Sequence, residues 1–265
     1  MAHLDATEKD NLRLARRIRR LESNMEQLEE MRETNARLMD KLLADLAAER
    51  QRSEALLLNV LPQRIVDRLH AGETTIADRH DDVAVVFSDF VGFTDLAART
   101  SAPRLVGDLN ALFSAFDAAC DRHGVEKIKT IGDAYLAVAG LSAEGVTPEG
   151  VTPRDPAVAA ADAALEMRAA TEATAGTWQI RIGIEVGPVV AGVIGTAKFA
   201  YDVWGDAVNT ASRIETSAPP GAIQVSDRVA ERLRGAFELT PVGSVDLKGK
   251  GPTRTWLLAG RSGPA

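Results

Sequence analysis

Two aspartates are the first residues whose positions point to chemistry. Asp89 directly follows the apolar run Val83–Ser88, and Asp133 stands in a Gly132-Asp133 turn between two further apolar runs. Carboxylates on rigid strand ends suit Mg²⁺ or Mn²⁺, with substrate phosphates and water completing the coordination shell. A pair of such ions could activate an attacking hydroxyl and neutralise a leaving phosphate. The alternative is that Asp89 caps the next helix and Asp133 only forms a turn.

Several other kinds of site are excluded by missing patterns. The chain contains no Gly-x-x-x-x-Gly-Lys-Ser/Thr phosphate loop, no Gly-x-Gly-x-x-Gly fingerprint and no Gly-x-Ser-x-Gly elbow. The four histidines are not at metal-ligand spacing, and the single cysteine, Cys120, rules out an internal disulfide and fits a reducing compartment.

The sequence predicts that alternating strands and helices position the two aspartates. Strands are predicted at Val83–Ser88, Val125–Ile131 and Ala134–Ala139, followed by two strands at Trp178–Val186 and Val189–Ile194. Helices are predicted at Ala102–His123, Pro156–Thr171 and Asp206–Thr216, and a loop at residues 142–154. The order β-α-β-β-α-β, with further α and β elements at the C-terminus, predicts an α+β fold of the ferredoxin-like kind. Because the first and third strands of that sheet are neighbours, both carboxylates could reach one point.

The N-terminal segment has a different composition. All 21 glycines lie at or beyond Gly72 and all 12 aromatic residues lie at or beyond Phe87, whereas 23 of the first 54 residues are charged. Such a segment predicts a long helix. Its apolar positions recur in alternating steps of four and three, which is typical of a coiled-coil seam; they are Leu14, Ile18, Leu21, Met25, Leu28, Met39, Leu42, Leu46, Leu56 and Val60.

Four polar seam positions, Arg32, Asn35, Glu49 and Ser53, predict a weak or adjustable coiled coil in a parallel dimer, with Asn35 as a candidate for setting the register. The alternative is a solvated helix that packs on its own globular domain. Pro62 opens a second, short helix to Leu69, and Gly72 ends this region. We therefore divide the chain into a helical segment, residues 1–72, and a globular domain, residues 80–262.

The net charge and the short apolar stretches of the chain exclude several classes of binding partner. The net charge is −7, from 31 basic and 38 acidic residues, which argues against a protein that coats nucleic acid or an anionic membrane. No uncharged apolar stretch approaches the length of a bilayer span, and no secretory signal is visible. We expect a cytoplasmic domain, and a membrane anchor or a sensor domain preceding residue 1 is compatible with this expectation.

Four separated blocks resemble the motifs of class III nucleotide cyclases, in the family's order. They are Phe87–Thr94, Glu126–Tyr135, Tyr201–Arg213 and Leu247–Gly251. The resemblance covers residues 80–259, and Leu57–Leu69 is similar to the linker helix that precedes many cyclase domains.

The resemblance implies conversion of ATP to 3′,5′-cyclic AMP and pyrophosphate, by attack of the ribose 3′-hydroxyl on the α-phosphate. It assigns two divalent ions, Mg²⁺ or Mn²⁺, to Asp89 and Asp133. Lys129 and Asp202 would read adenine, whereas guanylyl cyclases are expected to carry Glu and Cys, or similar residues, at these positions. The remaining roles are ribose orientation by Asn209, transition-state stabilisation by Arg213, and phosphate binding by Arg181 and Lys248.

The family resemblance further implies a homodimer whose composite sites take metal and base-reading residues from different protomers. A structural reading of each residue stays open: Lys129 and Arg181 as surface strand cations, Asp202 in a turn, Lys248 in a solvated loop. Two other functions compete, a catalytically silent dimerising module and a guanylyl or relaxed-specificity cyclase. All eight family positions are filled, which disfavours the first, and the Lys/Asp pair disfavours the second. The acidic chain offers no basic groove for a nucleic acid template.

Overall fold

The computed structural model describes residues 2–58, 60–141, 154–174, 178–195 and 198–263. The chain divides into two compact units, Met1–Asp67 and Arg68–Ala265, which we describe separately. The loop predicted at residues 142–154 lies outside the described residues except for Arg154. No helix in the described part of the chain is long and apolar enough to cross a membrane.

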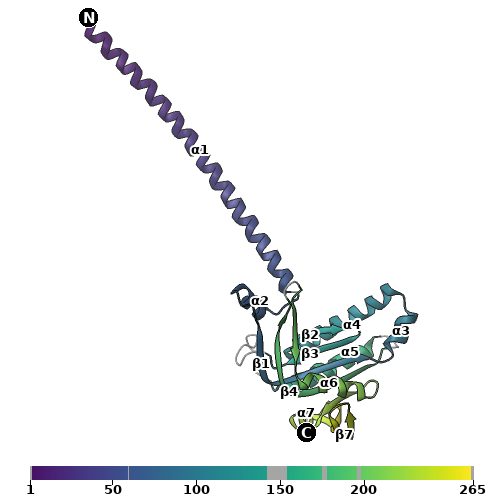
Figure 1. Ribbon diagram of the computed structural model, residues 1–265. Coiled ribbons are helices and arrows are strands. Elements are labelled where there is room, and N and C mark those ends of the chain that lie inside the picture. Colours follow the sequence, from purple (N-terminus) through teal and green to yellow (C-terminus); the bar gives the residue numbers. More distant parts are fainter. Residues whose placement is uncertain (1, 59, 142–153, 175–177, 196–197, 264–265) are drawn as a thin grey trace. The chain divides into compact units, whose positions relative to one another are not determined.

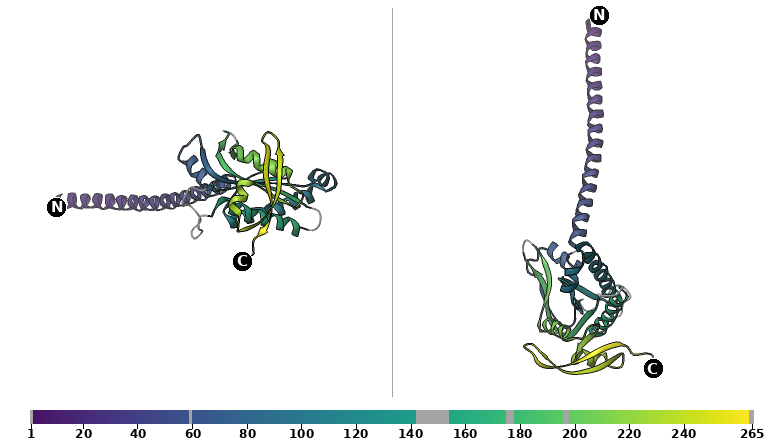
Figure 2. Two further views of the ribbon diagram at one scale, coloured as in Figure 1. Left: turned by 90° about the horizontal axis from the view of Figure 1, so that it is seen from below. Right: turned by 90° about the vertical axis from the view of Figure 1, so that its right-hand side faces the viewer.

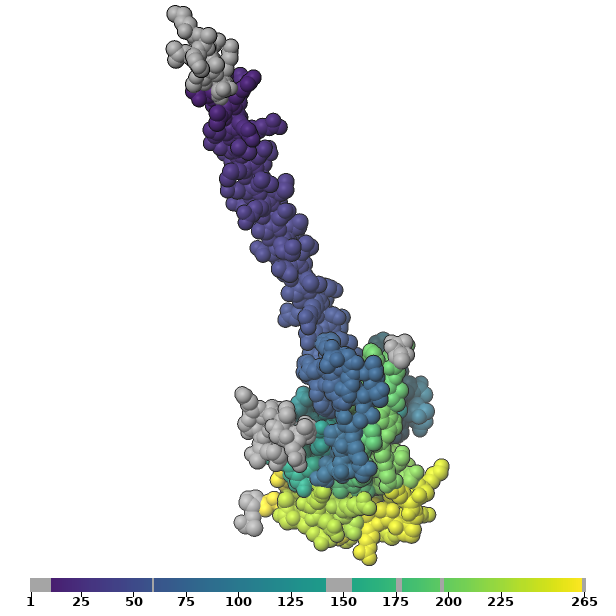
Figure 3. Space-filling model, turned by 60° about the vertical axis from the view of Figure 1, so that its left-hand side comes forward, coloured from purple at the N-terminus to yellow at the C-terminus, as the bar shows by residue number. Residues whose placement is uncertain are grey.

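The first unit consists mainly of one long helix, α1 (Ala2–Leu58), drawn in purple to blue in Figure 1. All ten apolar seam residues of the sequence pattern are exposed, from 50% at Ile18 to 67% at Leu46. The space-filling view shows residues 11–58 as a single helical rod (Figure 3). The predicted helix is confirmed, and its apolar seam is open to solvent in the single chain.

A short helix, α2 (Gln63–His70), follows Pro62, whose carbonyl accepts a hydrogen bond from the Ile65 amide at 2.9 Å. Proline suits this position because the first turn of a helix leaves its amides without partners.

The second unit is built on a mixed sheet with the strand order β2-β3-β1-β4-β6-β8-β7 and with β5 paired to β4 (Figure 1). Among the strand pairs of the described residues, only β4–β6 is parallel. The strands are β1 (Ala77–Phe90), β2 (Val125–Ile131), β3 (Ala134–Ala139), β4 (Ile180–Ile194), β5 (Ala200–Trp204), β6 (Ile223–Ser226), β7 (Phe237–Leu247) and β8 (Gly251–Arg261). The expected pairing of the first and third strands is confirmed, with Ser88 opposite Tyr135.

Helices cover the two faces of the sheet unequally (Figure 2). The helices are α3 (Phe93–Arg99), α4 (Ala102–His123), α5 (Pro156–Ala173), α6 (Asp206–Ser217) and α7 (Asp227–Leu233). Ile182 and Ile184 of β4 belong to a core that includes residues of α4, α5 and α7. Gly183, between them, faces the opposite side, where a Cβ would lie 2.2 Å from the Ala211 carbonyl oxygen of α6. Only a glycine therefore lets α6 lie this close to the centre of the sheet.

One prediction about the strands was wrong. Residues 178–194 were expected to form two strands around Gly187-Pro188, but β4 runs without a break from Ile180 to Ile194. The partner strand β1 changes register between His80 and Val83, so two residues, Asp81 and Asp82, lie opposite the single residue Pro188. This bulge lets the sheet continue past a residue that has no amide hydrogen to donate.

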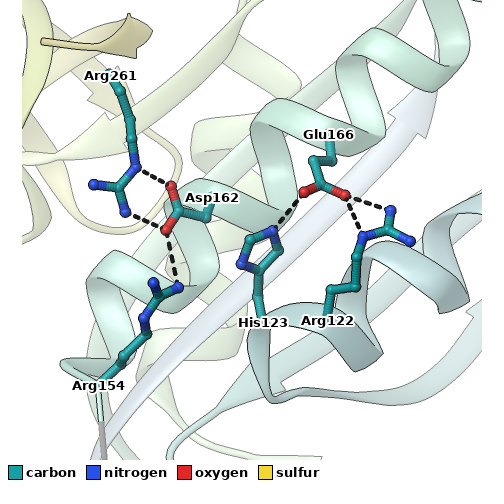
Figure 4. Close-up of polar contacts among 6 residues, drawn as sticks. All are labelled: Arg122, His123, Arg154, Asp162, Glu166 and Arg261. Carbon is teal, nitrogen blue, oxygen red and sulfur yellow. Dashed lines mark hydrogen bonds and ion pairs between the residues drawn. The ribbon is translucent and has the colours of Figure 1, made fainter. Parts of the chain in front are cut away.

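A polar cluster joins α4, α5 and β8 away from the predicted site (Figure 4). Glu166 accepts hydrogen bonds from His123 Nε2 at 2.7 Å and from Arg122 Nε at 2.9 Å. Asp162, one turn earlier on α5, accepts from Arg261 Nε at 2.7 Å. The neighbouring Arg122 and His123 hold the pKa of Glu166 below its usual range. These contacts hold the end of the last strand against α5.

Glu185 is a buried carboxyl group at the centre of β4. Its Oε1 accepts hydrogen bonds from Ser226 Oγ and the Val186 amide, both at 2.8 Å. Burial nevertheless raises the pKa of Glu185 above its ordinary value of 4.5. The folded state therefore binds the proton more tightly than the unfolded state.

We expect Glu185→Gln to stabilise the protein at about pH 8 and to lose this advantage towards about pH 5. A raised carboxyl pKa gives stability that is present below the unfolded pKa and lost as the pH rises through the folded one. Glutamine keeps an oxygen acceptor and has no proton to lose in this range. Thermal unfolding of both proteins across this pH range measures the difference, with the exposed Glu231→Gln as the control. An advantage for Glu185→Gln that does not change with pH would contradict the prediction.

Candidate active site

The two aspartates lie together at one end of the central strands. Asp89 is the penultimate residue of β1, and Asp133 lies in the β2–β3 turn, where Gly132 adopts a φ of 65°. Burial, together with a side-chain hydrogen bond and like charge from Asp89, raises the pKa of Asp133 to about 6. Two carboxyls at one point repel each other, and a divalent cation between them would relieve that repulsion. The donor set therefore fits Mg²⁺ or Mn²⁺.

These two carboxyls leave most of a coordination shell to other groups. No cluster of three or more His, Cys, Asp or Glu residues that could hold a metal occurs among the described residues. Substrate phosphates and water would have to supply the remaining ligands, as is usual for Mg²⁺. The alternative role of Asp89 as a helix cap is not realised, because α3 begins after Gly92 without a side-chain cap.

Arg181 lies opposite Asp89 in the β1–β4 register. Its Nη2 lies 3.7 Å from Asp89 Oδ2, and its Nε lies 3.0 Å from Glu215 Oε1 of α6. Burial raises the pKa of Glu215 to about 7, and the Arg181 charge opposes this shift. The predicted phosphate-binding arginine thus lies between Asp89, a predicted metal ligand, and the buried Glu215.

Lys129 and Asp202 form a direct pair although 73 residues separate them. Lys129 Nζ on β2 lies 2.5 Å from Asp202 Oδ2 on β5. The Val203 amide donates to the other oxygen, Asp202 Oδ1, at 2.9 Å, which fixes the carboxylate orientation. The site therefore presents a cationic donor and an anionic acceptor side by side, with both groups partly exposed.

Asn209 and Arg213 lie one turn apart on α6, so they share a helix face. Asn209 is exposed and Arg213 is half-buried. Within the described residues, neither side chain makes a hydrogen bond or an ion pair. Both are therefore available to a ligand on this face of α6.

Lys248 lies in the turn between β7 and β8 and is exposed. The turn reaches α6, because a Cβ added to Gly249 would lie 3.7 Å from Arg213 Nη1. Lys250 of the same turn forms an ion pair with Asp206, the first residue of α6. The predicted Lys248 and Arg213 are thus carried by two elements in contact.

The structure brings the eight predicted residues together in separate groups. Named for their predicted roles, Asp89, Asp133 and Arg181 form the metal group, and Lys129 and Asp202 form the base-reading group. The other three residues, Asn209, Arg213 and Lys248, lie on α6 and on the β7–β8 turn. In the described part of the chain, no hydrogen bond or ion pair links the metal group to the base-reading group.

Sequence reasoning missed three residues around this site. Glu215 was overlooked although it lies two positions beyond Arg213 on the opposite, buried side of α6. Asp206 and Lys250 belong to the motifs Tyr201–Arg213 and Leu247–Gly251, but the resemblance assigned no function to either residue. Helical spacing could have indicated the burial of Glu215, but the Asp206–Lys250 contact joins segments 44 residues apart.

Comparison with known proteins gives a family for this arrangement. Residues 75–260 match the model of the adenylate and guanylate cyclase catalytic domain. A relative named adenylate cyclase from Mycobacterium tuberculosis is 46% identical over 223 residues, which are 82% of this chain and 48% of the relative. The chain thus spans about half the length of that relative.

Two solved structures have the same fold. The guanylate cyclase domain of a Catenaria anguillulae protein, solved with GTP, is 37% identical with a TM-score of 0.64 and covers 70% of this chain and all of its own. The catalytic core of a rhodopsin-guanylyl cyclase with converted specificity, solved with ATPαS, is 39% identical with a TM-score of 0.63 and covers 70% of this chain and 98% of its own. With its fold, its paired aspartates and this family match over most of its length, the chain belongs to the family of adenylate and guanylate cyclase catalytic domains.

Proposed function

We propose that the protein is an adenylyl cyclase that converts ATP to 3′,5′-cyclic AMP and pyrophosphate. The observation that carries this proposal is the contact between Lys129 and Asp202 at 2.5 Å. Adenine offers an acceptor at N1 and a donor at its exocyclic amine, which match the ammonium and the carboxylate. Guanine offers a donor at N1 and an acceptor at O6, so both contacts would be mismatched. Unpaired polar groups in a binding site are costly, and the pair would therefore select ATP.

Asp89 and Asp133 would hold the two divalent ions. When bound, these ions supply charge neutralisation at the phosphates and a lower pKa for the attacking ribose hydroxyl. The two aspartates come from β1 and from the β2–β3 turn, so the sheet fixes their spacing.

The remaining residues act by position and charge. Asn209 would orient the ribose, and Arg213, four residues along α6, would stabilise charge that develops on the α-phosphate. Arg181 and Lys248 would bind the other phosphates. Phosphoryl transfer requires little else from a protein, because positioning and electrostatic stabilisation provide most of the catalysis.

The active unit in this proposal is a homodimer with composite sites. The support is that no hydrogen bond or ion pair joins the metal group to the base-reading group in the described part of one chain. Asp89, Asp133 and Arg181 of one protomer would face Lys129, Asp202, Asn209, Arg213 and Lys248 of the other.

A guanylyl or relaxed-specificity cyclase is the second candidate, because a relative of the same fold was solved with GTP. The Lys129–Asp202 pair favours ATP over this alternative. A silent module is disfavoured because all eight functional positions are filled.

The purified protein should produce cyclic AMP from ATP in Mg²⁺ or Mn²⁺ and prefer ATP to GTP by about a hundredfold or more in kcat/KM. The double variant Lys129→Glu, Asp202→Cys should lose ATP turnover and gain GTP turnover. Quantifying both cyclic nucleotides by mass spectrometry tests this, with Lys127→Met on the same strand as a control. No cyclic AMP from the wild type under either metal would refute the proposed function.

A mixture of Asp89→Ala and Arg213→Ala chains should recover activity that each variant lacks alone. Random pairing gives half heterodimers with one intact site each, so we expect about a quarter of the wild-type specific activity. Asn209→Ala mixed with Arg213→Ala is the matched control and should stay inactive, because both changes fall in the same half of the site. Equal activity in the two mixtures would rule out composite sites.

The exposed seam of α1 supports dimerisation through a parallel coiled coil. Replacing Leu21, Leu28 and Leu42 by Gln should raise the dimer dissociation constant more than about tenfold, because their burial in the seam would be lost. Leu12, Leu38 and Leu43 are equally exposed but lie off the seam, so the same replacements there are the control. Sedimentation equilibrium and specific activity measure the outcome. An unchanged dimer in the seam variant would overturn the coiled-coil proposal.

A further inference from the structure

The turn between β7 and β8 contacts α6 at two points. Lys250 forms an ion pair with Asp206 at the first residue of the helix. Further along α6, the Arg213 guanidinium lies beside Gly249, close enough that an added Cβ would be 3.7 Å from Nη1. The Lys250–Asp206 ion pair therefore joins the turn to the helix, and Arg213 lies beside the turn without a hydrogen bond or ion pair to a described residue.

The turn has a fixed shape of its own. Leu247 is buried, and its carbonyl accepts a hydrogen bond from the Lys250 amide at 2.8 Å. Gly249 and Gly251 each adopt a φ of 73°, which residues with a side chain rarely tolerate. Lys248 is therefore carried on a hydrogen-bonded turn, and its place relative to α6 depends on how that turn meets the helix.

Close packing does not fill the space beside this contact. A cavity of about 500 Å³ is lined by Asp206, Thr210, Lys250 and Pro252, together with residues of β4 and α7. Because side chains do not fill this cavity, the Lys250–Asp206 ion pair is the contact that we expect to fix the distance between the β7–β8 turn and α6.

We propose that Lys250 and Asp206 are positioning residues that hold the β7–β8 turn against α6, so that Lys248 and Arg213 act on the same triphosphate. This inference rests on the proposed function. Asp206 is 69% exposed and Lys250 is 29% exposed, and such pairs contribute little to stability. The pair keeps Lys248 and Arg213 at the spacing at which both can reach one triphosphate.

Lys250 could instead bind a phosphate directly, and exchanging the charges separates the two roles. Lys250→Met and Asp206→Asn should each lower kcat by about tenfold or more, since small displacements of catalytic groups are costly. The swap Asp206→Lys, Lys250→Asp should recover most of that loss, because it restores the pair. A swap as inactive as Lys250→Met would overturn the proposal. Arg232→Met, which removes an ion pair with Asp82, is the control outside the site.

The complementing heterodimer gives a second, sharper test. Its single intact site takes α6 and the turn from the Asp89→Ala chain and takes the metal group from the Arg213→Ala chain. Lys250→Met should therefore reduce turnover when placed on the Asp89→Ala chain and leave it unchanged on the other. Equal losses on both chains would indicate a general structural effect and would contradict the proposal.

Hydrogen exchange of the wild-type and Lys250→Met proteins separates this inference from the proposed function. Loss of the pair should speed amide exchange in residues 248–251 by severalfold, and the melting temperature should stay within a few degrees of the wild type. That result in a protein without cyclase activity would support the contact and refute the function. Unchanged exchange in an active cyclase would refute the contact alone.

Discussion

The antiparallel pairing of β1 with β4 is the constraint on which the rest of the site depends. Its register places Arg181 opposite Asp89, and β3 on the other side of β1 starts directly after Asp133. On β4, Gly183 leaves room for the backbone of α6, the helix of Asn209 and Arg213. A one-residue slip in this pair would turn the side chains of one strand to the other face of the sheet. The geometry of the candidate site is therefore set by backbone hydrogen bonding between the central strands of the sheet.

The cations near the candidate site are individual residues and do not belong to a broad basic surface. The chain is acidic overall, with a net charge of −7, yet its candidate phosphate-binding groups are a few individual cations. Several of them already have a carboxylate partner: Arg181 with Asp89 and Glu215, Lys129 with Asp202, and Lys250 with Asp206. Such partners fix the orientation of long side chains before a ligand arrives, and preorganised charge is what phosphoryl transfer requires.

The sequence predicted the elements well where local signals are strong. The bounds of α4 matched because Ser101 and Pro103 mark its start and Gly124, with a φ of 67°, marks its end. The single strand β4 was mistaken for two because Pro188 is a local signal for a break, whereas the bulge that tolerates it lies on the partner strand. Glu215 was missed for a similar reason. Helical spacing could have indicated that Glu215 is buried, but its contact with β4 depends on how α6 packs on the sheet.

By itself, the sequence determined the family resemblance, the α+β order of elements, the long helix with its apolar seam, and the identity of the eight residues assigned to the site. These properties follow from residue type and short-range spacing, which the chain carries before it folds. Only the tertiary structure decided which of these residues meet. Lys129 with Asp202 and Asp206 with Lys250 are contacts across 73 and 44 residues, and strand register and helix packing bring them together. Such contacts depend on the whole sheet, because each strand position is fixed by its neighbours on both sides.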